Sequence, residues 1–319
     1  MNEPTTLQEA VQYFADPGVC LEFIAKLRWP NGAVCPICGR ADVRFIPTRR
    51  LWECKGKHIR KQFSVKVGTV FEDSPISLDK WLAALWMLVN AKNGTSSYEV
   101  HRSIGVTQKT AWFMLHRIRL AMQTRTFCKF GGEVEADETF IGGKARFMHK
   151  ERRERKIRGT GGVDKTAVMG LLERHSPKGH STVKAKVVPN IRKQVLAEEV
   201  REHVAAGSEL FTDALQCYES LGKDFVHQVI NHAEAYAKGK VHTNGLENFW
   251  SLLKRAIKGS YVNVEPFHLF RYLDEESFRF NERKNDDAGR FREVVRQIVG
   301  KRLTYRALTG DGLTSIATA

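Results

Sequence analysis

Apolar residues in the first 28 positions recur at helical spacing, with one interruption. A threonine pair precedes LQEAVQYF and can cap a helix, and Asp16-Pro17-Gly18 divides the stretch, so we expect two short helices. From Trp29 to about Phe71 the pattern changes to short β-prone pieces, VRFIP, RLWEC and KQFSVKV, separated by Gly, Pro and charged residues. The pattern predicts an N-terminal helical segment at 1–28 and a small β module at 29–75.

Helical periodicity returns after this module, beginning with SLDKWLAALWMLVNA. In the following stretch, TSSYEVHRSIGVTQKTAWFMLHRIRLAM, we expect a short helix to end at Ile104-Gly105 and a longer helix to start at Gln108. Two helices joined by a short turn that contains glycine form a helix-turn-helix, so we predict a DNA-binding domain at 76–126. An ordinary αα-hairpin is the alternative.

Strand and helix patterns alternate in the second half of the chain. EVEADETF, TAVMGLLER, STVKAKVV and SELFTDA have strand patterns, and the helical patterns are IRKQVLAEEVREHV, NFWSLLKRAI and FHLFRYLDEESFRFNERK. Three strands, a helix, a strand and further helices predict an α/β domain at 130–285. A C-terminal helix and a flexible tail are expected at 286–319.

The charge balance indicates a polyanionic partner. The chain has 51 Lys and Arg against 36 Asp and Glu, a formal net charge of +15. A basic protein without a nucleic-acid role remains an alternative, and a membrane surface is a weaker one. On the predicted second helix of the helix-turn-helix, His116, Arg117 and Arg119 suit contacts with DNA phosphates, and suit a solvated helix face equally well. Apolar runs are too short to span a bilayer and no secretory signal is evident, so we expect a cytoplasmic, nucleoid-associated protein without a membrane partner.

Four residues have the spacing of a zinc site. Cys35 and Cys38 form a CxxC in VCPICG, and WECKGKHIRKQF adds Cys54 and His58. Three thiolates and a neutral imidazole are normal ligands of one structural Zn²⁺ ion. A redox CxxC fits poorly because no βαβ pattern surrounds it, and a pair of merely buried thiols is the other alternative.

Three acidic residues are candidate ligands of a divalent metal. Asp137 lies in the acidic stretch EVEADETFIGGK, Asp213 ends the short strand of ELFTDALQCY, and Glu247 begins an amphipathic helix. Carboxylates on two strands and a helix can surround two hard cations, and magnesium prefers oxygen ligands. For each acid alone, a strand-end or helix-start position without function is the alternative.

ADETFIGGK, FTDALQCY and HTNGLENFWSLLKRAIKGSY resemble insertion-sequence transposases that carry an N-terminal zinc ribbon, a branch of the DDE transposases. CPICG, WECK and the following RKQFSVKVGTVFEDSPISL are similar to the ribbon of that family, so the resemblance runs from about Leu21 to Arg283. It implies an RNase H-like catalytic domain. It also implies that Asp137, Asp213 and Glu247 bind two Mg²⁺ or Mn²⁺ ions.

The third metal position of this family varies between Glu, Asn and His, and all three occur here as His242, Asn244 and Glu247. A carboxylate binds magnesium better than an amide does, so we expect Glu247 as the ligand. His242 and Asn244 are then supporting residues beside the ligands, or Asn244 caps the helix. Glu138 should point to the opposite face of its strand from Asp137. The CxxxH in place of a second CxxC departs from the common ribbon and leaves the fourth zinc ligand open.

The resemblance implies transposition of an insertion sequence. The ribbon and the helix-turn-helix would bind terminal inverted repeats, and the catalytic domain would cleave the ends and join them to target DNA, as a dimer or larger assembly. Lys144 and the basic loop 146–158 suit phosphate contact, as do Lys254, Arg255 and Lys258, although a solvated surface suits each equally well. The alternatives are a zinc-dependent DNA-binding regulator, which would not need the three acids, and a nuclease or Holliday-junction resolvase that cuts without joining.

Overall fold

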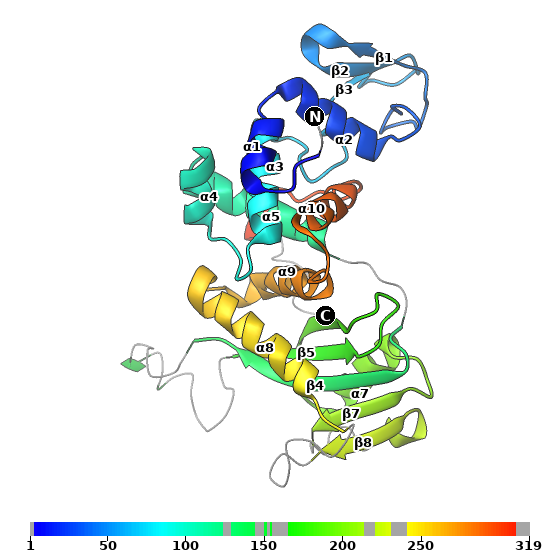
Figure 1. Cartoon of the computed structure of the whole chain (residues 1–319), viewed down its shortest axis with the longest axis vertical. Coiled ribbons are helices and arrows are strands. Elements are labelled where there is room, and N and C mark those ends of the chain that lie inside the picture. The colour runs from blue at the N-terminus through cyan, green and yellow to red at the C-terminus, as the bar shows by residue number, and fades with distance from the viewer. Residues whose placement is uncertain are drawn as a thin grey trace. The chain divides into compact units, whose positions relative to one another are not determined.

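The chain forms two compact units in this computed structural model (Figure 1). The first combines Met1–Gln123 with Lys284–Ala319, and the second runs from Thr124 to Arg283. Because both ends of the chain belong to one unit, the second unit is an insertion into the first. Among the described residues, no helix is long and apolar enough to cross a membrane. The described residues are 3–123, 129–143, 150–151, 154, 165–213, 221–230 and 241–310.

A small antiparallel sheet occupies the predicted β module. Its order is β1-β2-β3, with β1 Val43–Ile46, β2 Leu51–Cys54 and β3 Gln62–Phe63. The ring of Trp52 packs on Trp29 and Phe63, with centroid distances of 5.1 Å and 6.2 Å. The third strand is shorter than the sequence predicts because the chain after Phe63 forms hydrogen-bonded turns instead of a ladder.

The helices of the first unit begin and end close to the predicted residues. Asp16 caps the second helix, and Gly105 ends α4 in the left-handed region at φ 63°. Thr107 accepts a hydrogen bond from the backbone N–H of Thr110 and so caps α5. The expected pair of helices and the turn between them are present, and a DNA-binding role for this pair stays a prediction. The bounds are α1 Leu7–Tyr13, α2 Pro17–Arg28, α3 Leu78–Asn90, α4 Ser97–Ile104 and α5 Gln108–Met122.

The C-terminal helix α10 (Asp287–Arg296) packs on the N-terminal helices. Phe291 lies within 6 Å of three aromatic rings, those of Phe14, Phe23 and Trp86. A short helix, α11 (Tyr305–Thr309), follows it. The sequence predicted a C-terminal helix but could not indicate this packing, because nothing local pairs residues so far apart in the chain.

The second unit contains a mixed sheet of order β6-β5-β4-β7-β8 in its described residues. Strands β6, β5 and β4 pair antiparallel, whereas β4, β7 and β8 pair parallel. Three antiparallel strands extended by two parallel ones, with helices on both faces, form an RNase H-like fold, as predicted. The bounds are β4 Glu133–Ile141, β5 Thr166–Glu173, β6 Thr182–Val188, β7 Glu209–Asp213 and β8 Val226–Ile230.

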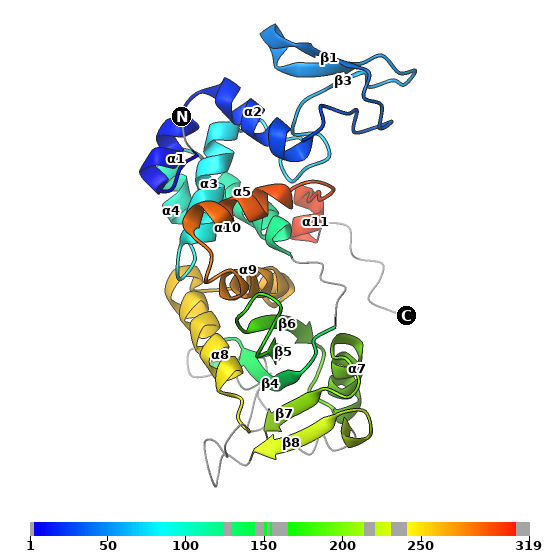
Figure 2. The ribbon, with the colours of Figure 1, turned by 45° about the vertical axis from the view of Figure 1, so that its right-hand side comes forward.

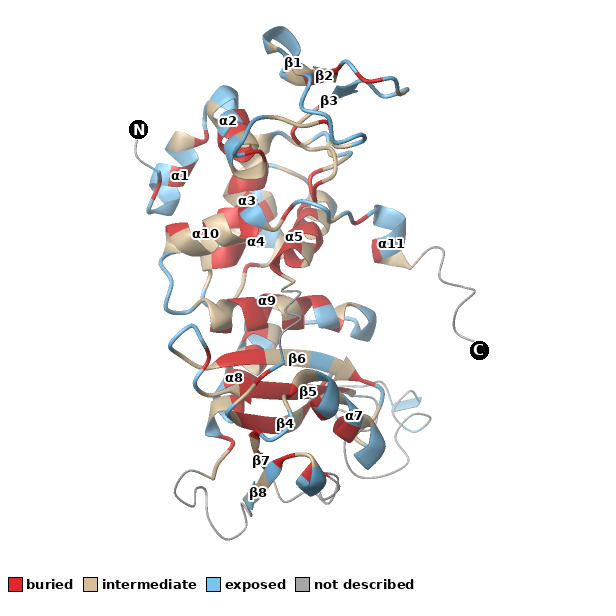
Figure 3. Ribbon diagram, turned by 90° about the vertical axis from the view of Figure 1, so that its right-hand side faces the viewer, coloured by how far each residue is buried: buried red, intermediate tan, exposed pale blue. Residues whose placement is uncertain are grey.

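Helices cover both faces of this sheet (Figure 2). On one face α7 (Lys193–His203) buries Leu196 and Val200 against Val134 and Ala136 of β4. On the other face lie α8 (Asn244–Ala256) and α9 (Leu269–Asn281). The central strands β4 and β5 are mostly buried (Figure 3), because both of their faces pack against helices.

Strand β8 was not predicted. It forms the edge of the sheet beside β7, and Val226 and Val229 are about half exposed. Edge strands have one unpaired side and need less apolar alternation, so their sequence signal is weak.

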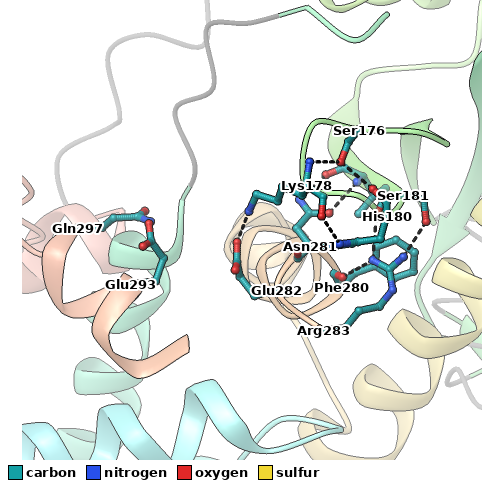
Figure 4. Close-up of polar contacts among 11 residues, drawn as sticks. Ser176, Lys178, His180, Ser181, Phe280, Asn281, Glu282, Arg283, Glu293 and Gln297 are labelled. Atoms are coloured by element: carbon teal, nitrogen blue, oxygen red, sulfur yellow. Dashed lines mark hydrogen bonds and ion pairs between the residues drawn. The ribbon is translucent and has the colours of Figure 1, made fainter. Parts of the chain in front are cut away.

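Polar contacts fasten the turn between β5 and β6 to the end of α9 (Figure 4). Asn281 bonds Val183 twice, accepting from its N–H at 2.7 Å and donating to its carbonyl at 2.9 Å. Arg283 donates to the carbonyl of Ser181 at 2.7 Å, and Lys178 pairs with Glu282. These contacts fix α9 on the sheet, and α8 packs beside α9.

Candidate metal centres

Asp137 and Asp213 lie on neighbouring parallel strands. In the register between β4 and β7, Ala136 is opposite Thr212. Asp137 and Asp213, which follow these two residues, therefore lie next to each other on adjacent strands. Successive side chains alternate between the faces of a sheet, which places Asp137 on the same face as Glu135 and Asp213 on the same face as Phe211. That face is the one covered by α8, because Leu246 and Trp250 of α8 contact Glu135 and Asp137.

Glu247 completes the group from the first turn of α8. Burial is the main cause that raises the pKa of Asp137, and the charges of Asp213 and Glu247 raise it further. Hydrogen bonds from the indole N–H of Trp250 and from the backbone N–H of Glu138 act in the opposite direction. The fold therefore brings the three predicted acids close enough for their charges to interact, with Glu247 exposed and Asp137 and Asp213 partly buried.

A second set of charges lies beside this group and was not predicted from the sequence. The Arg174 side chain donates from Nε to Glu135 at 2.8 Å and from Nη1 to Glu133 at 3.3 Å. Its Nη2 donates to the carbonyl of His242 at 2.6 Å. Glu133 and Glu135 share the strand face of Asp137 in the sequence pattern, which indicated acidic residues beside it. The position of Arg174 could not be predicted, because it depends on how β5 pairs with β4.

Glu138 faces away from this group, as strand alternation predicts. It lies on the face of Val134 and Ala136, and one carboxylate oxygen is buried without a hydrogen bond. Burial, followed by the charges of Asp137 and Asp213, raises the pKa of Glu138 to about 8. A carboxyl that is neutral at physiological pH and faces the opposite helix layer is a poor metal ligand.

The residues just before Glu247 have different surroundings. His242 Nδ1 lies 2.9 Å from Arg174 Nη2 and 3.4 Å from Glu135 Oε1, so its ring joins the charged set. Asn244 is exposed, and the cap residue of α8 is Thr243. The prediction that Asn244 might cap the helix is therefore wrong, because Asn244 already lies inside the first turn.

The first unit holds a different cluster. Cys35, Cys38, Cys54 and His58 each offer a ligand atom, and these four atoms lie within 4.8 Å of one another. Burial alone would raise the pKa of Cys35, but hydrogen bonds from the N–H groups of Cys38 and Ile37 bring it below the ordinary value. The cluster has the donor set of a structural zinc site, and His58 is in the fourth position as expected.

The structure contradicts the predicted phosphate contacts from α5. His116, Arg117 and Arg119 are 0%, 3% and 1% exposed. Arg117 bonds the carbonyl of Glu72 and lies over the rings of Trp81 and Phe113, and burial lowers its pKa to about 10. Arg117 is interior because the backbone at Glu72 and the ring of Trp81 enclose it, which the amphipathic pattern of α5 did not reveal.

The remaining basic candidates differ in exposure. Arg255 and Lys258 are exposed beyond the first turns of α8, and Lys254 is partly exposed. These three stay predictions. Lys144 and most of the basic loop 146–158 lie outside the described residues.

Two family models match the chain in the regions just described. Residues 129–281 match the ISXO2-like transposase domain, and residues 16–56 match the transposase zinc-ribbon domain. The chain is also similar to an uncharacterized protein in transposable element ISH50 from Halobacterium salinarum. The two are 29% identical over 257 residues, which span 77% of this chain and 84% of that protein. The chain therefore belongs to the insertion-sequence transposases that join a zinc ribbon to an ISXO2-like DDE transposase domain.

Proposed function

We propose that this transposase binds the terminal inverted repeats of its own insertion sequence, cleaves the DNA strand at each end and joins it to target DNA. One observation carries the proposal: Asp137, Asp213 and Glu247 come from two adjacent strands and a helix, and the charges of Asp213 and Glu247 both act on Asp137. Like charges held together without a cation are costly, which is what a divalent metal relieves.

The donor set fits two hard cations. All three side chains offer carboxylate oxygens, and Glu247 and Asp213 retain exposure through which a phosphate could approach. Mg²⁺ or Mn²⁺ bound there would neutralise charge on the scissile phosphate and lower the pKa of the attacking hydroxyl. The chain's own part is to hold three oxygens in place. A water oxygen then attacks phosphorus and breaks the P–O3′ bond, which leaves a 5′-phosphate and a free 3′-hydroxyl. That hydroxyl attacks a target phosphodiester, forms a new P–O bond and displaces the 3′-oxygen of the target strand, which leaves as a hydroxyl.

Other parts of the chain support this reaction. We assign one structural Zn²⁺ to Cys35, Cys38, Cys54 and His58, because four donors close its tetrahedral shell. Arg255 and Lys258 are proposed to contact DNA phosphates beside the catalytic group, with Lys254 and Lys144 as further candidates. Joining two element ends requires at least two active sites, so a dimer or larger assembly on DNA is proposed.

A strand-transfer assay tests the function. The purified chain is mixed with a duplex that carries one end of its element, a target plasmid and Mg²⁺. The wild-type chain should nick the end and join it, whereas Asp137→Asn and Glu247→Gln should lose both steps by a factor on the order of a thousand or more. Glu138→Gln, altered next to Asp137 but on the other face, is the matched control and should stay active.

The same assay separates the other functions. Nicked ends without joined product would indicate a nuclease or resolvase. Specific DNA binding without cleavage in the wild-type chain would indicate a regulator. Strand transfer by Asp137→Asn at the wild-type rate would contradict the catalytic assignment.

A further inference from the structure

Two hydrogen bonds join α8 to β4, one on each side of the position of Glu247. The backbone N–H of Leu246 donates to Glu135 Oε2 at 3.0 Å, and the indole N–H of Trp250 donates to Asp137 Oδ2 at 2.9 Å. Leu246 and Trp250 are four residues apart, hence on one helix face, and Glu135 and Asp137 are two apart on one strand face. Four residues of helix rise about 6 Å, and two residues of strand rise about 6.6 Å. The two elements therefore match in spacing and run in the same direction.

Glycines make room at both contacts. Gly170 on β5 is opposite Asp137, and a Cβ there would lie 2.6 Å from Cζ2 of Trp250. A Cβ on Gly245 would lie 2.8 Å from Glu135 Oε2. Real Cβ atoms do not approach so closely, so the helix reaches β4 only because both positions lack a side chain.

Arg174 holds the first contact in place. Its side chain is 10% exposed and that of Glu135 is 1% exposed, so the ion pair is shielded from water. The same guanidinium binds Glu133 and His242, and lies 4.2 Å from the ring centroid of Phe211 on β7. A guanidinium presents five donors in a rigid planar fork that can reach separated acceptors, a geometry that the compact ammonium of a lysine does not reproduce. One side chain thereby links β4, β5, β7 and the segment that leads into α8.

We propose that Arg174 and Trp250 are positioning residues that hold α8 in register along β4 and so aim Glu247 at the carboxylate of Asp137. Arg174 orients Glu135, and Glu135 in turn accepts the hydrogen bond from the Leu246 N–H that helps to hold α8 in place. Glu135 is not a metal ligand, because one of its oxygens accepts from Arg174 and the other from the helix N–H. Trp250 also donates to Oδ2 of Asp137 and so fixes the orientation of that carboxylate. This inference rests on the proposed metal role of Asp137 and Glu247.

The test measures Mn²⁺ affinity of the full, zinc-loaded chain by titration calorimetry, without DNA. Trp250→Phe removes the N–H and keeps a ring. Changes next to metal ligands typically weaken binding 10- to 100-fold, and we expect a loss in that range. Trp81→Phe is the matched control, because Trp81 is equally buried and its indole N–H bonds Ser74 at 3.0 Å in the first unit. It should lower the melting temperature of the zinc-loaded chain, measured without Mn²⁺, and leave the Mn²⁺ affinity unchanged.

Arg174→Lys is the second variant and keeps the charge, so the test does not depend on the folding of Trp250→Phe. It should also weaken Mn²⁺ binding, and high Mn²⁺ concentrations should restore strand transfer in both variants. If Trp250→Phe and Arg174→Lys keep wild-type Mn²⁺ affinity while Asp137→Asn loses it, the positioning role of Trp250 and Arg174 is overturned. The proposed function would then remain intact. Equal losses in Trp81→Phe and Trp250→Phe would reduce the role of Trp250 to general stability. Wild-type affinity in Asp137→Asn would overturn the metal site itself.

Discussion

The two candidate metal centres of this chain are assembled in opposite ways. The candidate zinc cluster draws its four ligands from residues 35–58, which lie within and just before one small sheet that ends at Phe63. The carboxylate centre draws Asp137, Asp213 and Glu247 from two strands and a helix that lie far apart in the sequence. The first has enough ligands to close a tetrahedral shell, whereas the second leaves coordination positions open.

The comparison shows where each centre obtains its order. In the ribbon a bound zinc ion would be the main source of order, because a short three-stranded sheet buries few apolar residues. In the second unit the protein is ordered without a metal. Two apolar cores, the Arg174 ion pairs and the Trp250 hydrogen bond hold the carboxylates in place against their mutual repulsion. Metal removal should therefore unfold one centre and leave the other folded.

The largest effect is expected from Cys35→Ser. Structural zinc contributes roughly 10–16 kcal/mol in zinc-finger peptides, so loss of one ligand should release the ion and unfold β1–β3. Zinc content measured by mass spectrometry should fall, and amide exchange of the ribbon should become fast. The Mn²⁺ affinity of the second unit should remain as in the wild-type chain; a parallel loss would show that the two centres are not independent.

A smaller effect is expected from Glu138→Gln. Because the pKa of Glu138 rises to about 8, the folded state keeps a proton that the unfolded state loses above about pH 4.5. The wild-type chain should therefore lose stability as the pH rises from 4.5 to 8, by up to about 1.4 kcal/mol per pH unit. Chemical denaturation of the metal-free second unit at pH 5, 6.5 and 8 measures this. The variant should show a flatter dependence, and an unchanged slope would contradict the buried, protonated carboxyl.

Gly170→Ala should cost less, roughly 1–3 kcal/mol, as overpacking usually does. The added Cβ would press on Trp250 and move α8, so strand transfer should fall more than the loss of stability explains. Gly131→Ala is the control, because a Cβ there meets nothing within 4 Å. Melting curves and strand-transfer rates of both variants measure the difference. Equal activity in the two would mean that α8 tolerates displacement.

The smallest effect is expected from His58→Cys. Four thiolates bind zinc as well as three thiolates and an imidazole, so zinc content and stability should stay within about 1 kcal/mol of the wild-type chain. An equally conservative Glu247→Asp should keep the fold but lose strand transfer, because the shorter side chain withdraws the carboxylate. Zinc loss in His58→Cys would contradict the assignment of His58.

The sequence was sufficient where the signal is local. The turn at Gly105, the cap at Thr107 and the spacing of Cys35 and Cys38 each need only a few neighbouring residues, and the structure agrees. Asp137 was chosen from the resemblance, and strand alternation alone predicted that Glu138 faces the other way, which the structure agrees with.

What could not be predicted depends on contacts between distant elements. Arg117 looked like a surface residue because helical periodicity does not reveal that α5 is enclosed by the loop at Glu72 and by Trp81. The role of Arg174 follows from the pairing of β5 with β4, and the edge strand β8 lacks a clear apolar alternation. Such information resides in packing and not in any short window of sequence.

The central claim is that three separated carboxylates form one metal centre. Anomalous diffraction from crystals grown with Mn²⁺, measured at the manganese and zinc absorption edges, tests it most directly. We predict manganese peaks bonded to Asp137, Asp213 and Glu247, none bonded to Glu135 or Glu138, and a single zinc peak at Cys35, Cys38, Cys54 and His58. Manganese bound elsewhere, such as at Glu199, Glu202 and His203 on α7, with the three carboxylates empty, would contradict the account.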